Sequence, residues 1–449
     1  MKYLLTAFAI VILSFIASHN QTSDAVLRRA IGDDAISRDA SGKLRSLSAA
    51  EHLARAEAYS SNRMFPQARE HWQIVFDNYP GDAGISKALF GTARSYMWER
   101  QYEKAVFWFD KLTASHLYTK DGREGLAFKG ASYVRLGKNL EAVKAYEQYV
   151  AAFPQGERIE SAHLNIIDAF REARRYDDAN IWVDRTAAKF VGKPAEINAL
   201  HARLRMEIFR ENWNGAIQAA DRLLNRGRFA GSMAGSDEVR YLKAFALEKA
   251  GRKAEAASVY TSLVDASYYG GLASDKNKVT GSYASRSVAE YPVMYRGELL
   301  QSARKYKIDP RFVLAIMKQE SSFKAAAKSP AGARGLLQLV FDTALKYNKK
   351  AGFPTLNPDD LYQPATNIAI GSAYIGDLKN QFGGLYEAIA ASYNGGEDNA
   401  VRWLARSKPK EAGIFASEVG FAESKAYVFK VMNNYRAYRE LYTEDLMRR

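Results

Sequence analysis

The chain has 449 residues, of which 47% are hydrophobic and 25% charged, so two or three globular domains with sizeable cores are expected. Its net charge of +14 is spread along the sequence and indicates either a merely basic surface or attraction to a polyanion. The sequence contains no cysteine, which excludes disulfides, thiolate nucleophiles and cysteine metal sites.

The six histidines all precede residue 202. The C-terminal half therefore has neither a Ser-His-Asp triad nor a histidine-based zinc site, and its chemistry must use carboxylates, lysines or hydroxyls. No metal or cofactor is predicted. No nucleic-acid-binding motif is found either, so nucleic acid is not an expected partner.

Residues 1–25 have the pattern of a secretory signal peptide. Lys2 is followed by an apolar run from Tyr3 to Ala17, which is shorter than the roughly 20 residues of a membrane span. An uncleaved anchor is the alternative. Without cysteine a lipoprotein anchor is excluded, so we expect an exported protein with no stable membrane span after cleavage. Residues 26–45 are polar and charged, and a flexible tether with at most one loose helix is predicted.

A repeat begins near Leu47 and predicts a helical-repeat domain, with a hinge, over residues 46–285. Two columns of residues recur every 37 positions; they are Ala68, Ala105, Ala142, Ala179 and Ala216 in the first, and Tyr59, Tyr96, Tyr133 and Phe170 in the second. Each unit is interpreted as a helix pair that must stack on its neighbours to bury both faces. A sixth, irregular unit near residues 244–266 uses Ala254 or Ala256 in the alanine role.

These units resemble tetratricopeptide-type repeats, with a period slightly longer than the usual 34. We interpret the aromatic column as inter-helix packing. The resemblance also implies a surface able to bind a protein partner. A stretch rich in Lys, Ser, Gly and Asn over residues 274–287 is the clearest boundary, so a second domain is predicted over residues 286–449.

A carboxyl on an apolar helix stripe is the main chemical feature of this second domain. Asp309 and Pro310 predict a helix start, and the helix is expected to run to about Ser322. Glu320 lies on its apolar stripe, which consists of Phe312, Val313, Ile316 and Phe323. Burial raises the pKa of such a carboxyl and keeps it protonated near neutral pH, where it can donate a proton to a leaving group. The alternative is a buried glutamate satisfied by an ion pair or the backbone.

Ser329-Pro330 and two glycines, Gly332 and Gly335, predict the helix stop. A second amphipathic helix is expected over residues 336–345, with Gln338 at its start. The string E-S-x-F followed by S-P-x-G-A-x-G-L-x-Q-L resembles the catalytic segment of the soluble lytic murein transglycosylases, which belong to the goose-type lysozyme fold.

Two further strings extend the resemblance. Tyr393-Asn394-Gly395 is similar to the family's A-Y-N-A-G-P motif, but Glu397-Asp398 replace the usual Pro-Gly, which puts the shape of the following loop in doubt. Phe421 to Val428 is similar to F-x-E-T-x-x-Y-V, with Lys425 where arginine is common. A match of Ser321-x-x-Lys324 to the S-x-x-K motif of penicillin-binding proteins lacks a K-T-G partner and is interpreted as chance.

The resemblance implies an all-α chain, in which a TPR-like α-superhelix precedes a mostly helical, lysozyme-like catalytic domain. Glu320 is the predicted catalytic residue. The predicted substrate-binding residues are Ser321, Ser329, Leu337, Gln338, Tyr393, Asn394, Glu423 and Tyr427. Asn394 and Glu423 have an alternative role as helix caps, and Tyr427 an alternative role in packing.

The resemblance further implies cleavage of the β-1,4 bond between N-acetylmuramic acid and N-acetylglucosamine in peptidoglycan, with a 1,6-anhydro product. Glu320 would act first as acid and then as base, since no second acid has a matching motif. The expected partner is the glycan strand, and the expected location is the periplasm. Two alternatives stay open. One is a hydrolytic muramidase, with Glu387, Glu423 or Asp398 as base, and the other is a non-catalytic glycan-binding scaffold.

Overall fold

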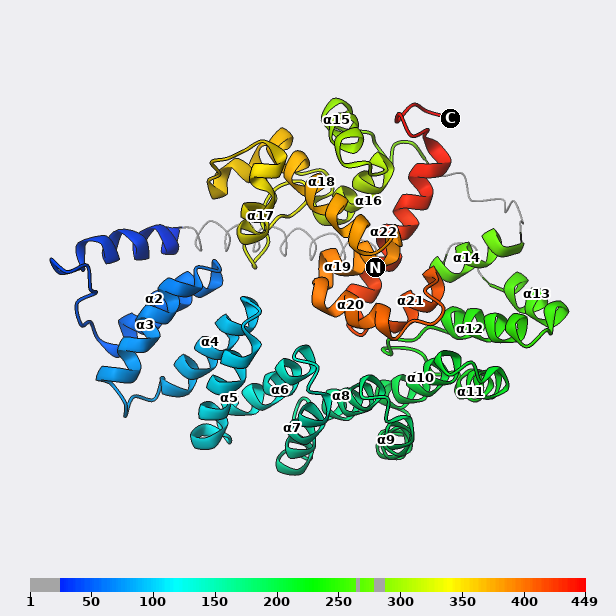
Figure 1. The fold of residues 1–449 in the computed structure, drawn as a ribbon, viewed down its shortest axis with the longest axis horizontal. Coiled ribbons are helices and arrows are strands. Elements are labelled where there is room, and N and C mark those ends of the chain that lie inside the picture. Colours follow the sequence, from blue (N-terminus) through cyan, green and yellow to red (C-terminus); the bar gives the residue numbers. More distant parts are fainter. Residues whose placement is uncertain (1–24, 264–266, 278–286) are drawn as a thin grey trace, which may run out of the picture. The chain divides into compact units, whose positions relative to one another are not determined.

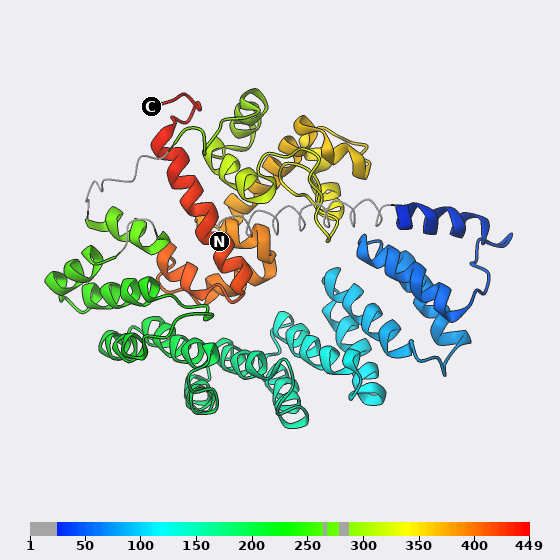
Figure 2. The same ribbon diagram turned by 180° about the vertical axis from the view of Figure 1, so that it is seen from behind.

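The computed structural model describes residues 25–263, 267–277 and 287–449, and consists of α-helices joined by short turns (Figures 1 and 2). The predicted signal peptide lies outside these residues apart from its last residue. The chain forms two compact units. The first contains the described residues up to Tyr149, with Ala327–Arg334 and Val340–Asp342, and the second contains the other described residues. No helix in these ranges is both long and apolar enough to span a membrane.

The first unit consists of a short helix over residues 25–36 and consecutive helix pairs. Its labelled helices are α2 (Ala49–Ser61), α3 (Phe65–Asn78), α4 (Ile85–Trp98), α5 (Tyr102–His116), α6 (Lys120–Arg135) and α7 (Asn139–Ala152), the last of which ends three residues inside the second unit.

The second unit continues the helix pairs and then changes to helices that cross at varied angles. The paired helices are α8 (Ile159–Glu172), α9 (Tyr176–Lys189), α10 (Pro194–Phe209), α11 (Trp213–Arg226), α12 (Ser236–Lys249) and α13 (Lys253–Thr261), and α14 (Tyr268–Asn277) follows the last pair. The others are α15 (Arg296–Tyr306), α16 (Pro310–Ser321), α17 (Phe341–Ala351), η1 (Pro358–Tyr362), α18 (Pro364–Gln381), α19 (Tyr386–Gly395), α20 (Glu397–Ala405), α21 (Ala412–Glu418) and α22 (Ala422–Leu441).

The 37-residue period is confirmed at the start of every second helix. Helices α3, α5, α7, α9 and α11 begin 37 residues apart, and the alanine four positions into each is fully buried. An alanine side chain at this position lets the paired helix approach closely. In the sixth unit α13 begins at Lys253, and Ala256 is buried while Ala254 is exposed, so Ala256 takes the alanine role.

The turn inside each pair has the same backbone conformation. The residue two positions before each second helix has a positive φ; these residues are Arg63, Arg100, Gly137, Arg174, Glu211 and Gly251. A left-handed residue is the common way to end a helix, and glycine is its usual occupant. Four of these turns hold the conformation with a larger residue, so the stacking of the helices, rather than local preference, fixes the turn.

The segment expected to be a flexible tether is instead packed. Asp34, in the helix over residues 25–36, is 4% exposed. Its carboxylate accepts hydrogen bonds from Arg55 and Tyr59 of α2, and His71 of α3 lies 2.9 Å away. A buried carboxylate with several donors is ordered by them, so this helix belongs to the first unit.

Helix α16 packs against α22 and, less extensively, against α15. Helix α22 packs in turn against α19, and α15 packs against α18. Figure 2 shows α22, in red, crossing beside α16 and α19. As predicted, Asp309 caps α16 by accepting from the Arg311 backbone N–H, and Pro310 occupies the first position.

The predicted end of α16 at about Ser322 is confirmed, since the helix ends at Ser321 and Ser322 and Phe323 adopt left-handed conformations. The stop therefore comes before Ser329-Pro330 and not at these residues. The predicted start of the next helix is corrected, because that helix begins at Phe341 rather than at residue 336. Gln338 therefore lies in a turn, with φ of 46°.

Candidate active site

Glu320 lies in the last turn of α16 and is half-buried. Its approach to the protein interior follows from the sequence, because Phe312, Val313 and Ile316 on the same helix are almost completely buried. Phe323, expected to extend this stripe, follows the end of the helix and is half-exposed. The apolar stripe thus ends at the carboxyl, which leaves one side of Glu320 accessible.

The environment of Glu320 favours the protonated acid. Burial raises the pKa of Glu320 to about 7, and the negative charge of Glu423 adds to this effect. The Tyr427 hydroxyl opposes it by donating a hydrogen bond to Glu320 Oε1 at 2.6 Å, because that bond favours the carboxylate. Near neutral pH the carboxyl therefore exists in both protonation states in comparable amounts, as a group that must both donate and accept a proton requires.

A turn at Leu336–Gln338 is held next to α16 by three different helices. The Ser321 hydroxyl of α16 donates to the Leu336 carbonyl at 2.7 Å. The Tyr393 hydroxyl of α19 donates to the Leu337 carbonyl at 2.6 Å, and the Leu337 N–H donates to Asn367 of α18 at 2.8 Å. The backbone of this turn is thus fixed by side chains from separate parts of the sequence.

Two residues predicted to contact the substrate have side chains that make contacts inside the protein, and their contact with a glycan stays a prediction. Leu337 is fully buried and packs against Gly371 of α18. Ser321 is 7% exposed and its hydroxyl donates to the Leu336 carbonyl. Both residues shape the turn. The Tyr393 hydroxyl also donates within the protein, to the Leu337 carbonyl. Burial raises the pKa of Tyr393, and the charge of nearby Glu320 raises it further.

Three other predicted contacts retain polar atoms near the site. Gln338 is half-buried, with its amide nitrogen donating to the Gly335 carbonyl at 2.9 Å. Asn394 accepts from the Ser424 hydroxyl at 2.6 Å, which ties α19 to the first turn of α22. Glu423, in that same first turn, is exposed. Their contact with substrate stays a prediction.

Ser329 belongs to the first unit, in the segment Ala327–Arg334. Its hydroxyl accepts from the Ala333 N–H at 3.1 Å, and its backbone N–H donates to the Ala333 carbonyl at 2.9 Å. These bonds close a tight turn over Gly332, whose φ is 76°. The predicted contact of Ser329 with a sugar therefore stays a prediction.

Asn367, in the first turn of α18, supports the site and is not among the residues predicted from the sequence. It is fully buried, accepts from the Leu337 N–H and donates to the Leu361 carbonyl at 2.8 Å. Gly335 lies against the hydrogen bond between Asn367 and Leu361, because a Cβ at Gly335 would collide with the Leu361 carbonyl and the Asn367 amide. An asparagine among apolar residues was the only sequence signal, and it does not identify its partners.

Glu387, one of the bases considered for a hydrolytic enzyme, lies elsewhere in the core of the second unit. It is 4% exposed, accepts from the Tyr268 hydroxyl of α14 at 3.1 Å, and has its pKa raised by burial. Glu423, by contrast, is close enough for its charge to raise the pKa of Glu320. Of these two carboxyls, Glu423 is the one with an electrostatic effect on the acid.

Two regions of the chain match known protein families. Residues 299–415 match the family described as Transglycosylase SLT domain, and residues 129–191 match the Tetratricopeptide repeat family. The chain is 34% identical over 168 residues to the membrane-bound lytic murein transglycosylase C of Salmonella arizonae, covering 32% of this chain and 46% of that protein. It is 33% identical over 144 residues to the soluble lytic murein transglycosylase of Salmonella typhimurium, covering 32% and 22%.

The chain thus spans less than half the length of either curated relative. A solved structure of the lytic transglycosylase Slt from Pseudomonas aeruginosa, an inactive mutant, matches with a TM-score of 0.54 and 16% sequence identity, covering 94% of this chain and 88% of that one. This likeness concerns the fold. The predicted fold class, TPR-like helical repeats followed by a mostly helical lysozyme-like domain, is confirmed, and the motif resemblance is confirmed over residues 299–415.

Proposed function

We propose that this protein is a peptidoglycan lytic transglycosylase that cleaves the β-1,4 bond between N-acetylmuramic acid and N-acetylglucosamine and forms 1,6-anhydromuramic acid. The observation that carries the proposal is Glu320, a half-buried carboxyl whose pKa is raised to about 7 by burial. It lies inside the segment that matches the transglycosylase domain. The similarity to named lytic transglycosylases supports the same substrate class.

In the first step protonated Glu320 donates its proton to the glycosidic oxygen. The bond from that oxygen to C1 of the muramic acid breaks, and an oxocarbenium-like centre develops at C1. The neighbouring N-acetyl oxygen stabilises this centre, so that no carboxylate nucleophile from the protein is required. The Glu320 carboxylate formed in this step accepts the Tyr427 hydrogen bond of 2.6 Å, which stabilises the newly created charge.

In the second step the Glu320 carboxylate removes the proton from the C6 hydroxyl of the same sugar. The C6 oxygen bonds to C1 and closes the anhydro ring, and Glu320 is again an acid. The reaction consumes no water. Gln338 and Asn394 are proposed to bind the glycan, while Tyr393 and Ser321 keep the Leu336–Gln338 backbone in place for it.

Glu320→Gln tests this proposal. The amide cannot donate a proton of comparable acidity, so release of anhydro-muropeptides from purified peptidoglycan should fall by at least about 10²–10⁴-fold. Products are identified by mass spectrometry. Unchanged release by the variant would reject Glu320 as the acid. If neither the variant nor the wild type releases products or clears cell walls while both bind peptidoglycan, the non-catalytic scaffold is favoured.

A hydrolytic muramidase is the second candidate, and the position of Glu423 favours it. Glu423 is an exposed carboxylate whose charge raises the pKa of Glu320, and this supports a role in activating water. Hydrolysis leaves a reducing end, whose mass exceeds that of the anhydro product by one water. Reducing ends that disappear in Glu423→Gln would establish hydrolysis, whereas anhydro products made by both proteins would reject it.

We further propose that the protein is exported and acts on murein in the periplasm, as its leader sequence and its murein-acting relatives support. The expected substrate is the glycan strand. The TPR-like repeats are proposed as the surface that binds a protein partner, and the match to the Tetratricopeptide repeat family supports this role. Accumulation of a leader-fused reporter outside the inner membrane tests the export.

A further inference from the structure

Buried charges connect the repeat helices of the second unit with the chain that leads into α22. Helices α8, α10 and α12 each place a charged side chain against residues 417–425. This segment contains the end of α21 and the first turn of α22, and Tyr427 follows two residues later. The connection is entirely within the second unit.

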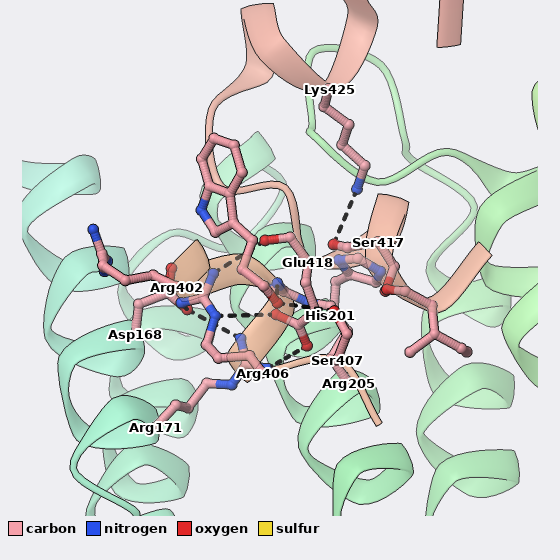
Figure 3. A network of polar contacts seen from close by, with 12 residues as sticks. Asp168, Arg171, His201, Arg205, Arg402, Arg406, Ser407, Ser417, Glu418 and Lys425 are labelled. Atoms are coloured by element: carbon pink, nitrogen blue, oxygen red, sulfur yellow. Dashed lines mark hydrogen bonds and ion pairs between the residues drawn. The ribbon is translucent and has the colours of Figure 1, made fainter. Parts of the chain in front are cut away.

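Glu418, the last residue of α21, is the centre of the first group of charges (Figure 3). Arg171 of α8 donates to one carboxylate oxygen at 2.6 Å, and Arg205 of α10 donates to the other at 2.8 Å. Arg406 donates to the Glu418 carbonyl at 3.0 Å. Burial alone would raise the pKa of Glu418, but the arginines outweigh it and lower the pKa to about 2, so this carboxylate is ionised and firmly held.

Lys425, in the first turn of α22, forms the second group with Glu238 of α12. Its ammonium donates to Glu238 Oε1 at 2.6 Å, and the two side chains are 3% and 1% exposed. It also donates to the Ser417 carbonyl at 3.4 Å (Figure 3). His201 of α10 lies 3.0 Å from the same Glu238 oxygen. A buried pair of this kind resists movement, because separating the charges would leave each uncompensated.

Lys425 and Tyr427 point in opposite directions from α22. Residues two apart on a helix differ by about 200° in direction. Lys425 therefore faces the repeat helix α12, and Tyr427 faces α16, where its hydroxyl contacts Glu320. The Ser424 hydroxyl bond to Asn394 fixes the same turn to α19.

We propose that the buried Glu238–Lys425 ion pair is a positioning device, which holds the first turn of α22 so that the Tyr427 hydroxyl stays on Glu320. In this way a repeat helix becomes part of the catalytic arrangement, and the repeats do more than carry the catalytic helices. The inference rests on the proposed role of Glu320 as the acid. Glu238 and Lys425 touch neither the acid nor the substrate, so they act through Tyr427.

The test measures the titration of Glu320 itself in the full-length protein. Glutamate side-chain carboxyls are labelled with ¹³C, and the Glu320 signal is identified by its absence in Glu320→Gln. Tyr427→Phe sets the reference, since loss of its hydrogen bond should raise the Glu320 pKa by about half a unit to one unit. The double variant Glu238→Gln/Lys425→Met replaces the charged pair with neutral side chains of similar size and avoids a lone buried charge.

We expect the double variant to raise the Glu320 pKa in the same direction as Tyr427→Phe, and to add nothing when combined with it. The single variant Lys425→Arg keeps the positive charge and should show the same Glu320 pKa as the wild type. Glu238→Asp retains the charge, shortens the side chain and should produce a smaller shift. An unchanged Glu320 pKa in the double variant, or a shift that simply adds to that of Tyr427→Phe, would overturn the proposal.

Glu196→Gln is the matched control. Glu196 lies on α10 and is 5% exposed. It accepts a hydrogen bond from the Gly192 N–H and pairs with Arg226, both inside the repeats. It should lose stability without moving the Glu320 pKa. The readout does not require turnover. A protein that forms no anhydro product but shows the expected titration would refute the proposed function alone, and one that forms anhydro product without the expected titration would refute this inference alone.

Discussion

Glu320 is subject to two opposing side-chain influences, and each can be removed separately. The Tyr427 hydroxyl lowers its pKa from the high value set by burial, while the Glu423 charge raises it. The acid must be protonated to begin the reaction, so kcat/KM should fall as pH rises above about 7. Tyr427→Phe should move this alkaline limb to higher pH, and Glu423→Gln should move it to lower pH. Full pH profiles on one defined muropeptide measure both, and shifts of the same sign would contradict this description.

The same carboxyl should reduce stability at neutral pH. Its pKa is about 7 in the folded protein and about 4.5 when unperturbed, so the native state binds more protons than the unfolded state between these values. The contribution of this one carboxyl to the free energy of unfolding must then decrease as pH rises from about 4.5 to 7. Glu320→Gln removes this loss and should be more stable than the wild type by about 1–3 kcal/mol at pH 8, with little difference at pH 4. Urea unfolding at both pH values measures it. A variant less stable than the wild type at pH 8 would show that the contacts of the Glu320 carboxylate offset the cost of burying it.

At the scale of elements, the turn before α17 depends on a single glycine. Gly335 combines a φ of 78° with contact against the Leu361 carbonyl and Asn367. Gly335→Ala should therefore lose about 3 kcal/mol or more, from left-handed strain plus overpacking, and should impair activity through the displaced Leu336–Gln338 turn.

Gly332→Ala provides the matched control. Gly332 has a φ of 76°, but the nearest atom to an added Cβ is 4.0 Å away. The loss should be limited to the conformational cost of about 1–2 kcal/mol. Denaturant unfolding of both variants distinguishes strain from crowding, and equal losses would argue that the contacts of Gly335 relax without cost.

Across the whole molecule, buried histidines should determine how stability responds to mild acid. Burial lowers the pKa values of His52, His163 and His201 to about 4, below the unperturbed 6.5. At these three positions the unfolded state therefore takes up more protons than the native state between these values. Three histidines together should outweigh the opposite contribution of the single Glu320, so the free energy of unfolding should decrease as pH falls from about 6.5 to 4.

His163→Gln removes one of these histidines and should make this dependence less steep than in the wild type. Urea unfolding at intervals between pH 4 and 7 measures the slope. Stability that is constant over this range would mean that the histidines are protonated without disturbing their surroundings.

The sequence predicted what is local and periodic. A 37-residue period fixes the helix starts and the buried alanines, and the position of Glu320 on an apolar stripe predicts its raised pKa. Features that depend on the meeting of distant residues were not accessible. The Lys425–Glu238 pair spans 187 residues, and the Asn367 bonds to Leu337 span 30. The helix start at Phe341 was missed because apolar spacing from Leu336 onward imitates a helix, whereas three separate side chains hold that stretch as a turn.

The left-handed residue that precedes every second repeat helix gives the array interchangeable joints. At each joint the residue has the same left-handed conformation and lies two positions before the helix, whether it is Arg63, Gly137 or Glu211. Excising the cassette between two such joints brings together ends of identical conformation, and duplicating it does the same. The number of helix pairs in proteins built this way is therefore free to vary by whole cassettes, while a gain or loss of any other length would misplace every helix that follows.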